Sequence, residues 1–182
     1  AEKLLMIGTG VLAQHLPMAH ASVRPIKQVR VWGRDSGKAA ALAQTLTAQG
    51  LSATPVGDLA EAVAWADVIS TATLSKTPIL QGAWLRPGQH IDLVGAFRPD
   101  MREADDAVLG RARIFCDTRA GAMKEAGDLC DPLARGAISE GDIEADLFDL
   151  AQGRVTVQRN PDDITLFKSA GTAIEDLAAA ML

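Results

Sequence analysis

The sequence predicts an α/β protein in which a doubly wound, mostly parallel sheet carries helices on both faces. Short apolar runs alternate with longer amphipathic stretches along the 182 residues, and this alternation is typical of parallel strands joined by helices. The first apolar run leads directly into a glycine-rich turn, Gly8-Thr9-Gly10. Together these observations favour a Rossmann-like fold.

Strands are predicted at residues 3–7, 28–32, 52–56, 67–71, 90–94, 113–116 and 164–167. Helices are predicted at residues 11–21, 36–49, 59–65, 119–129, 142–152 and 169–182. Pro17 should kink the first helix or move its start, and Asp58 should cap the third. We expect one dinucleotide-binding domain over residues 1–182, with a Rossmann core to about residue 118. A helical extension, a last strand and a C-terminal helix would complete it.

Composition argues against several classes of protein. The formal net charge is −5, whereas a nucleic-acid binder would show a basic patch. No apolar run approaches the ~20 residues that span a bilayer, and the first residues lack the organisation of a signal peptide. Cys116 and Cys130 form no CxxC pair, and the three histidines are scattered. We therefore expect a cytoplasmic protein with reduced thiols and no metal site.

The glycine-rich turn has the form G-x-G-x-x-A between a strand and a helix. Gly8 permits the tight turn, Gly10 lets the backbone approach a pyrophosphate, and Ala13 is small enough for the helix to pack on the strand. The N–H groups of Val11 and Leu12 would lie at the positive end of the helix and bind phosphate. The alternative is a plain strand–helix turn without a ligand.

The residues after the second strand bear on the choice of dinucleotide. NAD-binding folds usually place an acidic residue at the end of this strand, where it binds the ribose hydroxyls; here that position is Gly33. The missing carboxylate leaves room for a 2′-phosphate, which Arg34 can bind with its charged fork, with Ser36 and Lys38 nearby. This favours NADPH. Alternatively Arg34 is a solvated loop residue, and Asp35 either caps the next helix or binds ribose, which would admit NADH.

The loops after the fourth and fifth strands should hold the nicotinamide half, because ligands of doubly wound sheets bind beyond the carboxyl ends of the strands. Small and hydroxylated residues suit close packing on a ribose, and a Gly-Ala pair suits close approach to a flat ring. The candidates are Thr71, Ala72, Thr73, Gly95 and Ala96. The two threonines are equally well explained as hydroxyls that cap strand ends. No catalytic Ser/His/Asp arrangement is evident, and His90 has no visible partner.

Six stretches of the chain together resemble the ornithine cyclodeaminase/mu-crystallin family. They are residues 8–13, 31–34, 70–80, 92–106, 117–129 and 164–176, and their order and spacing cover nearly the whole chain. The resemblance implies a nicotinamide cofactor, cytoplasmic homodimers and chemistry at the carbon–nitrogen bond of small amino or imino acids. The last stretch adds Ser169 to the candidate cofactor-binding residues.

Within the family, the resemblance favours one branch. Cyclodeaminases look as if they carry a catalytic aspartate where this chain has Phe97, which cannot exchange a proton. The run Arg-Pro-Asp-Met-Arg-Glu-Ala-Asp at residues 98–105 is more similar to the ketimine reductases. That branch reduces cyclic imines, Δ1-pyrroline-2-carboxylate to proline or Δ1-piperideine-2-carboxylate to pipecolate. Phe97 would then form a wall of the substrate pocket. The alternatives are an ornithine cyclodeaminase with bound NAD and a non-catalytic, crystallin-like NADPH-binding module.

The resemblance also implies a substrate and dimerisation domain ahead of the glycine-rich turn, which this sequence does not contain. We therefore expect the cofactor-binding half of a longer enzyme, or a naturally shortened homologue. By itself this half should bind a dinucleotide better than it turns over an imino acid.

Overall fold

The computed structural model describes residues 1–181, and its strands form an eight-stranded sheet in the order β3-β2-β1-β4-β5-β8-β6-β7. Every pair of neighbouring strands is parallel. The predicted fold class is therefore confirmed. The strands are β1 (Lys3–Ile7), β2 (Gln28–Trp32), β3 (Ala53–Pro55), β4 (Val68–Thr71), β5 (His90–Leu93), β6 (Ala112–Cys116), β7 (Ile143–Asp146) and β8 (Ile164–Lys168).

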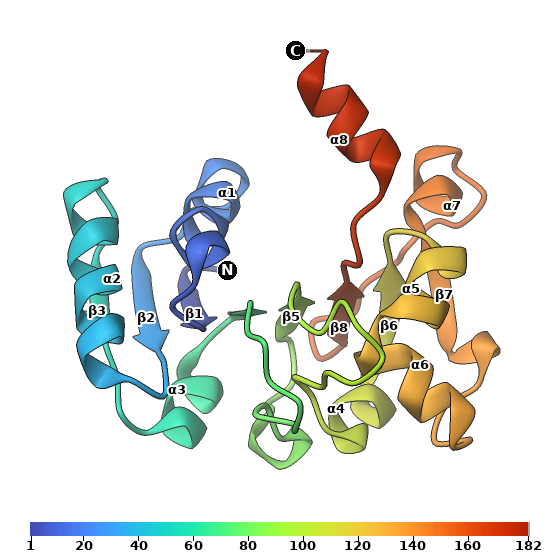
Figure 1. The fold of residues 1–182 in the computed structure, drawn as a ribbon, viewed down its shortest axis with the longest axis horizontal. Coiled ribbons are helices and arrows are strands. Elements are labelled where there is room, and N and C mark those ends of the chain that lie inside the picture. The colour runs from blue at the N-terminus through green and yellow to red at the C-terminus, as the bar shows by residue number, and fades with distance from the viewer. Residues whose placement is uncertain (182) are drawn as a thin grey trace.

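Helices flank both ends and both faces of this sheet (Figure 1). α1 and α2 lie beside β1, β2 and β3, whereas α5, α6 and α7 lie beside β6 and β7. α8 projects from the end of β8, away from the rest of the chain. The α-helices are α1 (Leu16–Val23), α2 (Ser36–Ala48), α3 (Leu59–Trp65), α4 (Asp106–Arg111), α5 (Arg119–Glu125), α6 (Gly127–Ala134), α7 (Leu147–Ala151) and α8 (Ala173–Ala180). Short 3-10 turns are η1 (Val11–Gln14), η2 (Gly82–Trp84) and η3 (Glu140–Asp142).

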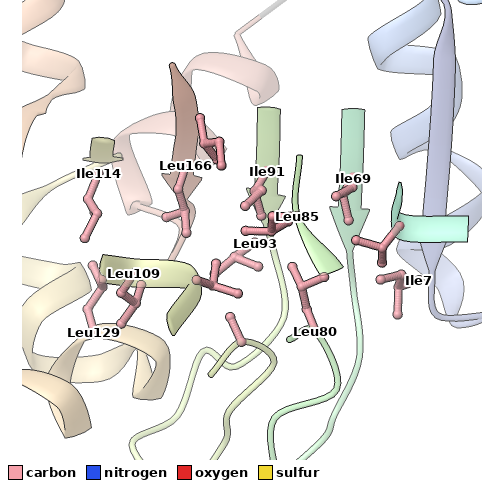
Figure 2. Packing of buried hydrophobic residues seen from close by; sticks show 14 of the residues in the cluster. Ile7, Ile69, Leu80, Leu85, Ile91, Leu93, Leu109, Ile114, Leu129 and Leu166 are labelled. Atoms are coloured by element: carbon pink, nitrogen blue, oxygen red, sulfur yellow. The ribbon is translucent and has the colours of Figure 1, made fainter. Parts of the chain in front are cut away.

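The two faces of the sheet carry separate apolar clusters, because alternate side chains of a strand point to opposite faces. One face presents residues such as Ile69, Ile91 and Leu166 to α3, α4, α5 and α6. Figure 2 shows Ile114 and Leu166 above Leu109 and Leu129, whereas Ile69 lies beside Ile7. The other face presents Leu4, Met6, Val29 and Val31 to α2. Packing on both faces keeps the carboxyl ends of the strands aligned along one edge of the sheet.

The first helix begins later than residue 11. Val11–Gln14 forms a single 3-10 turn, and α1 starts at Leu16 with Pro17 in its first turn. Proline is tolerated there because the first amides of a helix have no intrahelical acceptor. The prediction that Pro17 moves the helix start is thus confirmed, and the uninterrupted helix over residues 11–21 is wrong.

The C-terminal third contributes more to the sheet than predicted. Residues 142–152 were expected to be helical, but Ile143–Asp146 forms the edge strand β7 and only Leu147–Ala151 is helical. The predicted helix over 119–129 is two helices, α5 and α6. β8 lies between β5 and β6, and the last helix begins at Ala173. Ser169 therefore lies in a loop at the carboxyl edge of the sheet.

The second face of β4, β5 and β8 carries polar side chains. The Ser70 hydroxyl donates to Asp92 at 2.8 Å, and the same Asp92 oxygen lies 3.1 Å from Nε2 of His20 on α1. His90 Nδ1 lies 2.9 Å from the Thr165 hydroxyl. A cavity of about 760 Å³ opens over this face.

We predict that His90 stays neutral in the folded protein to well below neutral pH. Burial lowers the pKa of its imidazole from 6.5 to about 4, although Asp92 opposes the shift. Between these pH values the unfolded chain binds more protons, so the free energy of unfolding should fall as the pH drops from about 6.5 to about 4. An NMR titration of the His90 ring, with denaturant unfolding at each pH, measures both effects.

The His90→Gln variant is the control, because it removes the titrating group. It should lose this part of the pH dependence. A midpoint near 6.5 for the His90 ring would contradict the prediction.

Candidate functional site

A cavity of about 440 Å³ lies at the carboxyl edge of the sheet, where the loops after β1, β2 and β4 meet. β1 lies between β2 and β4. The strands β2 and β3 therefore extend the sheet on one side of β1, and the strands from β4 onward extend it on the other side. Ligands of open α/β sheets bind at such a switch point. The cavity is lined by Gly8, Thr9, Gly10, Trp32, Gly33, Arg34, Asp35, Lys38, Ala72, Thr73, Leu74 and Ile79.

Gly8 allows the loop after β1 to contact the loop after β4. Its φ is +119°, a region that side chains rarely adopt. A Cβ there would lie 2.5 Å from the backbone oxygen of Ala72. Because that neighbour is backbone, it cannot rotate away, and only glycine allows the two loops to touch.

Gly10 lines the cavity and is followed by backbone amides at the exposed start of η1. A Cβ at this exposed residue would meet no atom within 4 Å, and Gly10 offers no side-chain cap to η1. The first hydrogen bond of η1 runs from Ala13 N to Gly10 O at 3.1 Å. The N–H groups of Val11 and Leu12 precede that bond and are available to a ligand. Because η1 is a single 3-10 turn, these amides rather than a long helix dipole would supply the attraction.

The end of β2 forms the cationic side of the cavity. A Cβ on Gly33 would lie 2.7 Å from Cγ2 of Thr9, so a larger residue would displace the middle of the glycine-rich turn. Arg34 is exposed at the rim. Within the described part of the chain, its guanidinium forms no ion pair. This side can therefore meet a negatively charged group.

Asp35 is the helix cap of α2. Its Oδ1 accepts from the backbone N of Lys38 at 3.0 Å, as one of the sequence-based alternatives proposed. Ser36 is the first residue of α2 and is exposed, as is Lys38. Lys38 lines the cavity beside Arg34.

The β4 loop contributes Ala72 and Thr73 to the cavity, but the side chain of Thr71 points inward. The Thr71 hydroxyl is buried and donates to Glu103 at 2.7 Å. The Thr73 N donates to the same carboxylate at 2.6 Å. Thr71 therefore supports the loop from behind, and its hydroxyl points away from the cavity. Burial raises the pKa of Glu103, and the two threonine donors oppose this shift.

The β5 loop lies directly beside the β4 loop. A Cβ on Gly95 would lie 2.4 Å from Thr73 O. Gly95 and Ala96 are buried, whereas Phe97 is 48% exposed.

Ser169 follows β8 and is tied to the end of β5, since its N donates to Leu93 O at 3.0 Å. The next two amides, of Ala170 and Gly171, both donate to Asp117 Oδ2 at 2.6 Å. Sequence analysis gave Asp117 no role. A buried acid directly after a strand, within a stretch that resembles the family, was the available signal.

The larger cavity over the second face of the sheet is a weaker candidate. It involves Val68, His90 and Thr165, which begin their strands or lie one residue in. Open α/β sheets bind ligands at the opposite, carboxyl edge. We therefore assign the smaller cavity as the functional site.

The cavity has the features of a small-ligand pocket. It combines glycine-lined contacts with a cationic rim, and its volume lies in the range of such pockets, ~300–1,000 Å³. Among residues 1–181, no three metal-ligating side chains come together. No described helix has the length and apolarity to traverse a bilayer.

Comparison with known proteins supports this assignment. The family model described as the ornithine cyclodeaminase/mu-crystallin family matches residues 1–182. The Δ1-pyrroline-2-carboxylate reductase of Paracoccus denitrificans is 42% identical over 178 residues, which are 97% of this chain and 56% of the reductase.

Two solved structures are similar throughout. The Δ1-pyrroline-2-carboxylate reductase of Thermococcus litoralis, in complex with NADH and L-proline, has a TM-score of 0.96 at 32% identity and covers 100% of this chain. An archaeal alanine dehydrogenase dimer with bound NAD has a TM-score of 0.93 at 28% identity, also over 100% of this chain. The match covers 56% of each of those chains.

The chain thus spans somewhat more than half the length of the proteins it matches. The chain belongs to the ornithine cyclodeaminase/mu-crystallin family.

Proposed function

We propose that the protein carrying this chain reduces small cyclic imino acids with a reduced nicotinamide dinucleotide. The substrates would be Δ1-pyrroline-2-carboxylate, which gives L-proline, or Δ1-piperideine-2-carboxylate, which gives L-pipecolate. The main support is the glycine-lined cavity at the carboxyl edge of the sheet, in a chain that is 42% identical to a Δ1-pyrroline-2-carboxylate reductase. This chain would supply the cofactor-binding half.

Each loop would bind a different part of the cofactor. The amides of Val11 and Leu12 would hold the pyrophosphate, and the rim at Arg34 would hold the adenosine end. Thr73 and Ala96 would position the nicotinamide half. Fixed backbone groups need little rearrangement when the ligand binds, which lowers the cost of association.

The reaction needs a hydride at the carbon of the C=N bond and a proton at its nitrogen. The bound dihydronicotinamide supplies the hydride. Phe97, which is 48% exposed next to the nicotinamide loop, would exclude water from the reacting carbon. Both oxygens of Glu103 accept hydrogen bonds from the β4 loop, so this acid holds the loop and is not the proton donor.

Two alternative functions would give different results in the activity assay described below. An ornithine cyclodeaminase would release proline and ammonia from ornithine with bound NAD, but Phe97 stands where the resemblance implies a catalytic aspartate. A non-catalytic module would bind NADPH without turnover.

We predict that the full-length gene product oxidises NADPH or NADH when Δ1-pyrroline-2-carboxylate is added, with stoichiometric formation of proline. Absorbance of the reduced cofactor and amino-acid analysis measure this. Absence of turnover with both cyclic imines would contradict the proposal, and turnover of ornithine instead would identify a cyclodeaminase.

The Gly10→Asp variant tests whether the cofactor binds at the glycine-rich turn. A Cβ at Gly10 has open space around it, so the protein should fold. The new carboxylate should repel the pyrophosphate and weaken cofactor binding by about tenfold or more. Unchanged binding would place the cofactor elsewhere.

We further propose that NADPH is preferred over NADH. Gly33 offers no carboxylate for ribose hydroxyls, and Arg34 and Lys38 line that end of the cavity. Asp35 Oδ1 caps α2, which withdraws it from ribose. A guanidinium without an ion pair is the natural partner of a 2′-phosphate.

The Arg34→Ala variant tests this preference. It should weaken NADPH binding by ~1.5–3 kcal/mol, the range for a hydrogen bond to a charged group, and leave NADH binding nearly unchanged. Calorimetric titration with each cofactor measures both affinities. Arg24→Ala, outside the cavity, serves as control. Equal losses for NADPH and NADH would show that Arg34 does not contact the 2′-phosphate.

We also propose that the whole protein is a cytoplasmic homodimer. The similar archaeal alanine dehydrogenase is a dimer with bound NAD. Cys116 and Cys130 form no disulfide with each other, which is compatible with a reducing compartment. Light scattering on the full-length gene product should give twice the protomer mass; a monomer would contradict the proposal.

A further inference from the structure

Behind the loops of β4 and β5 lies a group of ionisable side chains that the binding site does not use directly. Lys168 and Asp128 are 0% exposed, and Glu103 is 1% exposed. Arg102, at 8% exposed, adjoins them. Burying ionised groups is costly unless they are paired, so their placement calls for a physical reason.

Lys168 is the last residue of β8 and pairs in register with Leu93 of β5. Its Nζ donates to Leu93 O at 3.1 Å and also to Gly95 O, and lies 3.7 Å from Asp128 Oδ2. Burial lowers the pKa of Lys168, whereas Asp128 and Glu103 raise it. Because Nζ is sealed in the interior and its donors are directed at carbonyl oxygens, it cannot reach a substrate.

The carbonyls that Lys168 binds belong to a strained loop. Ala96 has a φ of +49°, the only positive value for a non-glycine residue in residues 1–181. Such a conformation persists only when its surroundings hold it. Gly127 N holds the loop from one side by donating to Ala96 O at 3.0 Å. Lys168 holds it from below through Leu93 and Gly95.

Asp128 joins this loop to its neighbour. Its Oδ1 accepts from Glu103 N at 2.8 Å and Ala104 N at 3.0 Å. The Glu103 carboxylate in turn accepts from Thr71 and Thr73 of the β4 loop. One network of buried charges therefore fixes both loops that face the nicotinamide half.

We propose that Lys168 is a positioning residue that sets the backbone of Gly95 and Ala96 for the nicotinamide end of the cofactor, with Asp128 as its buried counter-charge. The inference rests on the proposed function, since it takes a nicotinamide dinucleotide as the ligand. It assigns Lys168 no chemical step: its contribution is to keep two carbonyls turned inward and the Ala96 backbone in its left-handed conformation.

The test compares two ligands that share the adenosine and pyrophosphate groups. Lys168→Met removes the charge and the donors at similar length. Affinity for NADPH should fall about tenfold or more, while affinity for the 2′-phosphate form of ADP-ribose, which lacks nicotinamide, should change less than about twofold. Calorimetry on this chain measures both, and in the full-length protein kcat for imine reduction should fall more than KM for the imine rises.

A double variant separates positioning from charge balance. Lys168→Met with Asp128→Asn removes both charges of the Lys168–Asp128 pair, and the Asn oxygen can still accept from Glu103 N and Ala104 N. Thermal unfolding should recover relative to Lys168→Met, but the tenfold loss for NADPH should persist because Leu93 O and Gly95 O still lack their donor. Lys124→Met, on the surface of α5, controls for the substitution itself.

Recovery of NADPH affinity in the double variant would overturn the proposal, because Lys168 would then only balance Asp128. Equal weakening of both ligands would overturn it too, since it would show general damage to the fold. Failure of the unmodified protein to bind either ligand would instead refute the proposed function, and the two failures are thereby distinguished.

Discussion

The loops after β1, β4 and β5 can lie against one another only because two of their residues have no side chain. A Cβ on Gly8 would lie 2.5 Å from Ala72 O, and one on Gly95 would lie 2.4 Å from Thr73 O. Both obstacles are backbone atoms, so neither can be relieved by a change of rotamer. Direct backbone packing therefore sets the spacing of the three loops, and the cavity that the loops after β1 and β4 line takes its position from it. The parallel sheet beneath makes this possible by bringing the carboxyl ends of the strands to one edge.

Different forces act on the two sides of these loops. Their outer side carries the exposed apolar side chains of Val11, Leu12, Leu74 and Phe97, of which Leu74 lines the cavity together with the small residues Gly8, Gly10 and Ala72. Toward the interior the loops are held by buried charges whose opposite signs lie close together. Electrostatic interactions are stronger in a low-dielectric interior than in water. The interactions on the inner side can therefore hold the loops in place. Their outer side, where a ligand must enter, does not need to be tightly packed.

Family membership and site geometry support each other at different levels. The match to the family model and the TM-score of 0.96 to a Δ1-pyrroline-2-carboxylate reductase concern the whole chain, whereas the choice of substrate and of phosphorylated cofactor depends on single residues such as Phe97 and Arg34. A fold alone supports many reactions. The residues at the carboxyl edge are therefore the features of this chain that favour imine reduction. The chain covers 56% of the solved reductase.

The sequence by itself determined the features that depend on neighbours along the chain. The apolar runs of β1 and β2, the glycine-rich turn between β1 and α1, and the Asp58 cap of α3 are local, and each was predicted where the structure has it. Only the tertiary structure decided the rest. Ile143–Asp146 has no strand signal of its own and becomes β7 by pairing with β6. Thr71 turns from the cavity because Glu103, distant in sequence, accepts its hydroxyl. Glu103, Asp128 and Lys168 look like surface charges in a sequence, because the desolvation that makes them significant arises only when separate segments pack together.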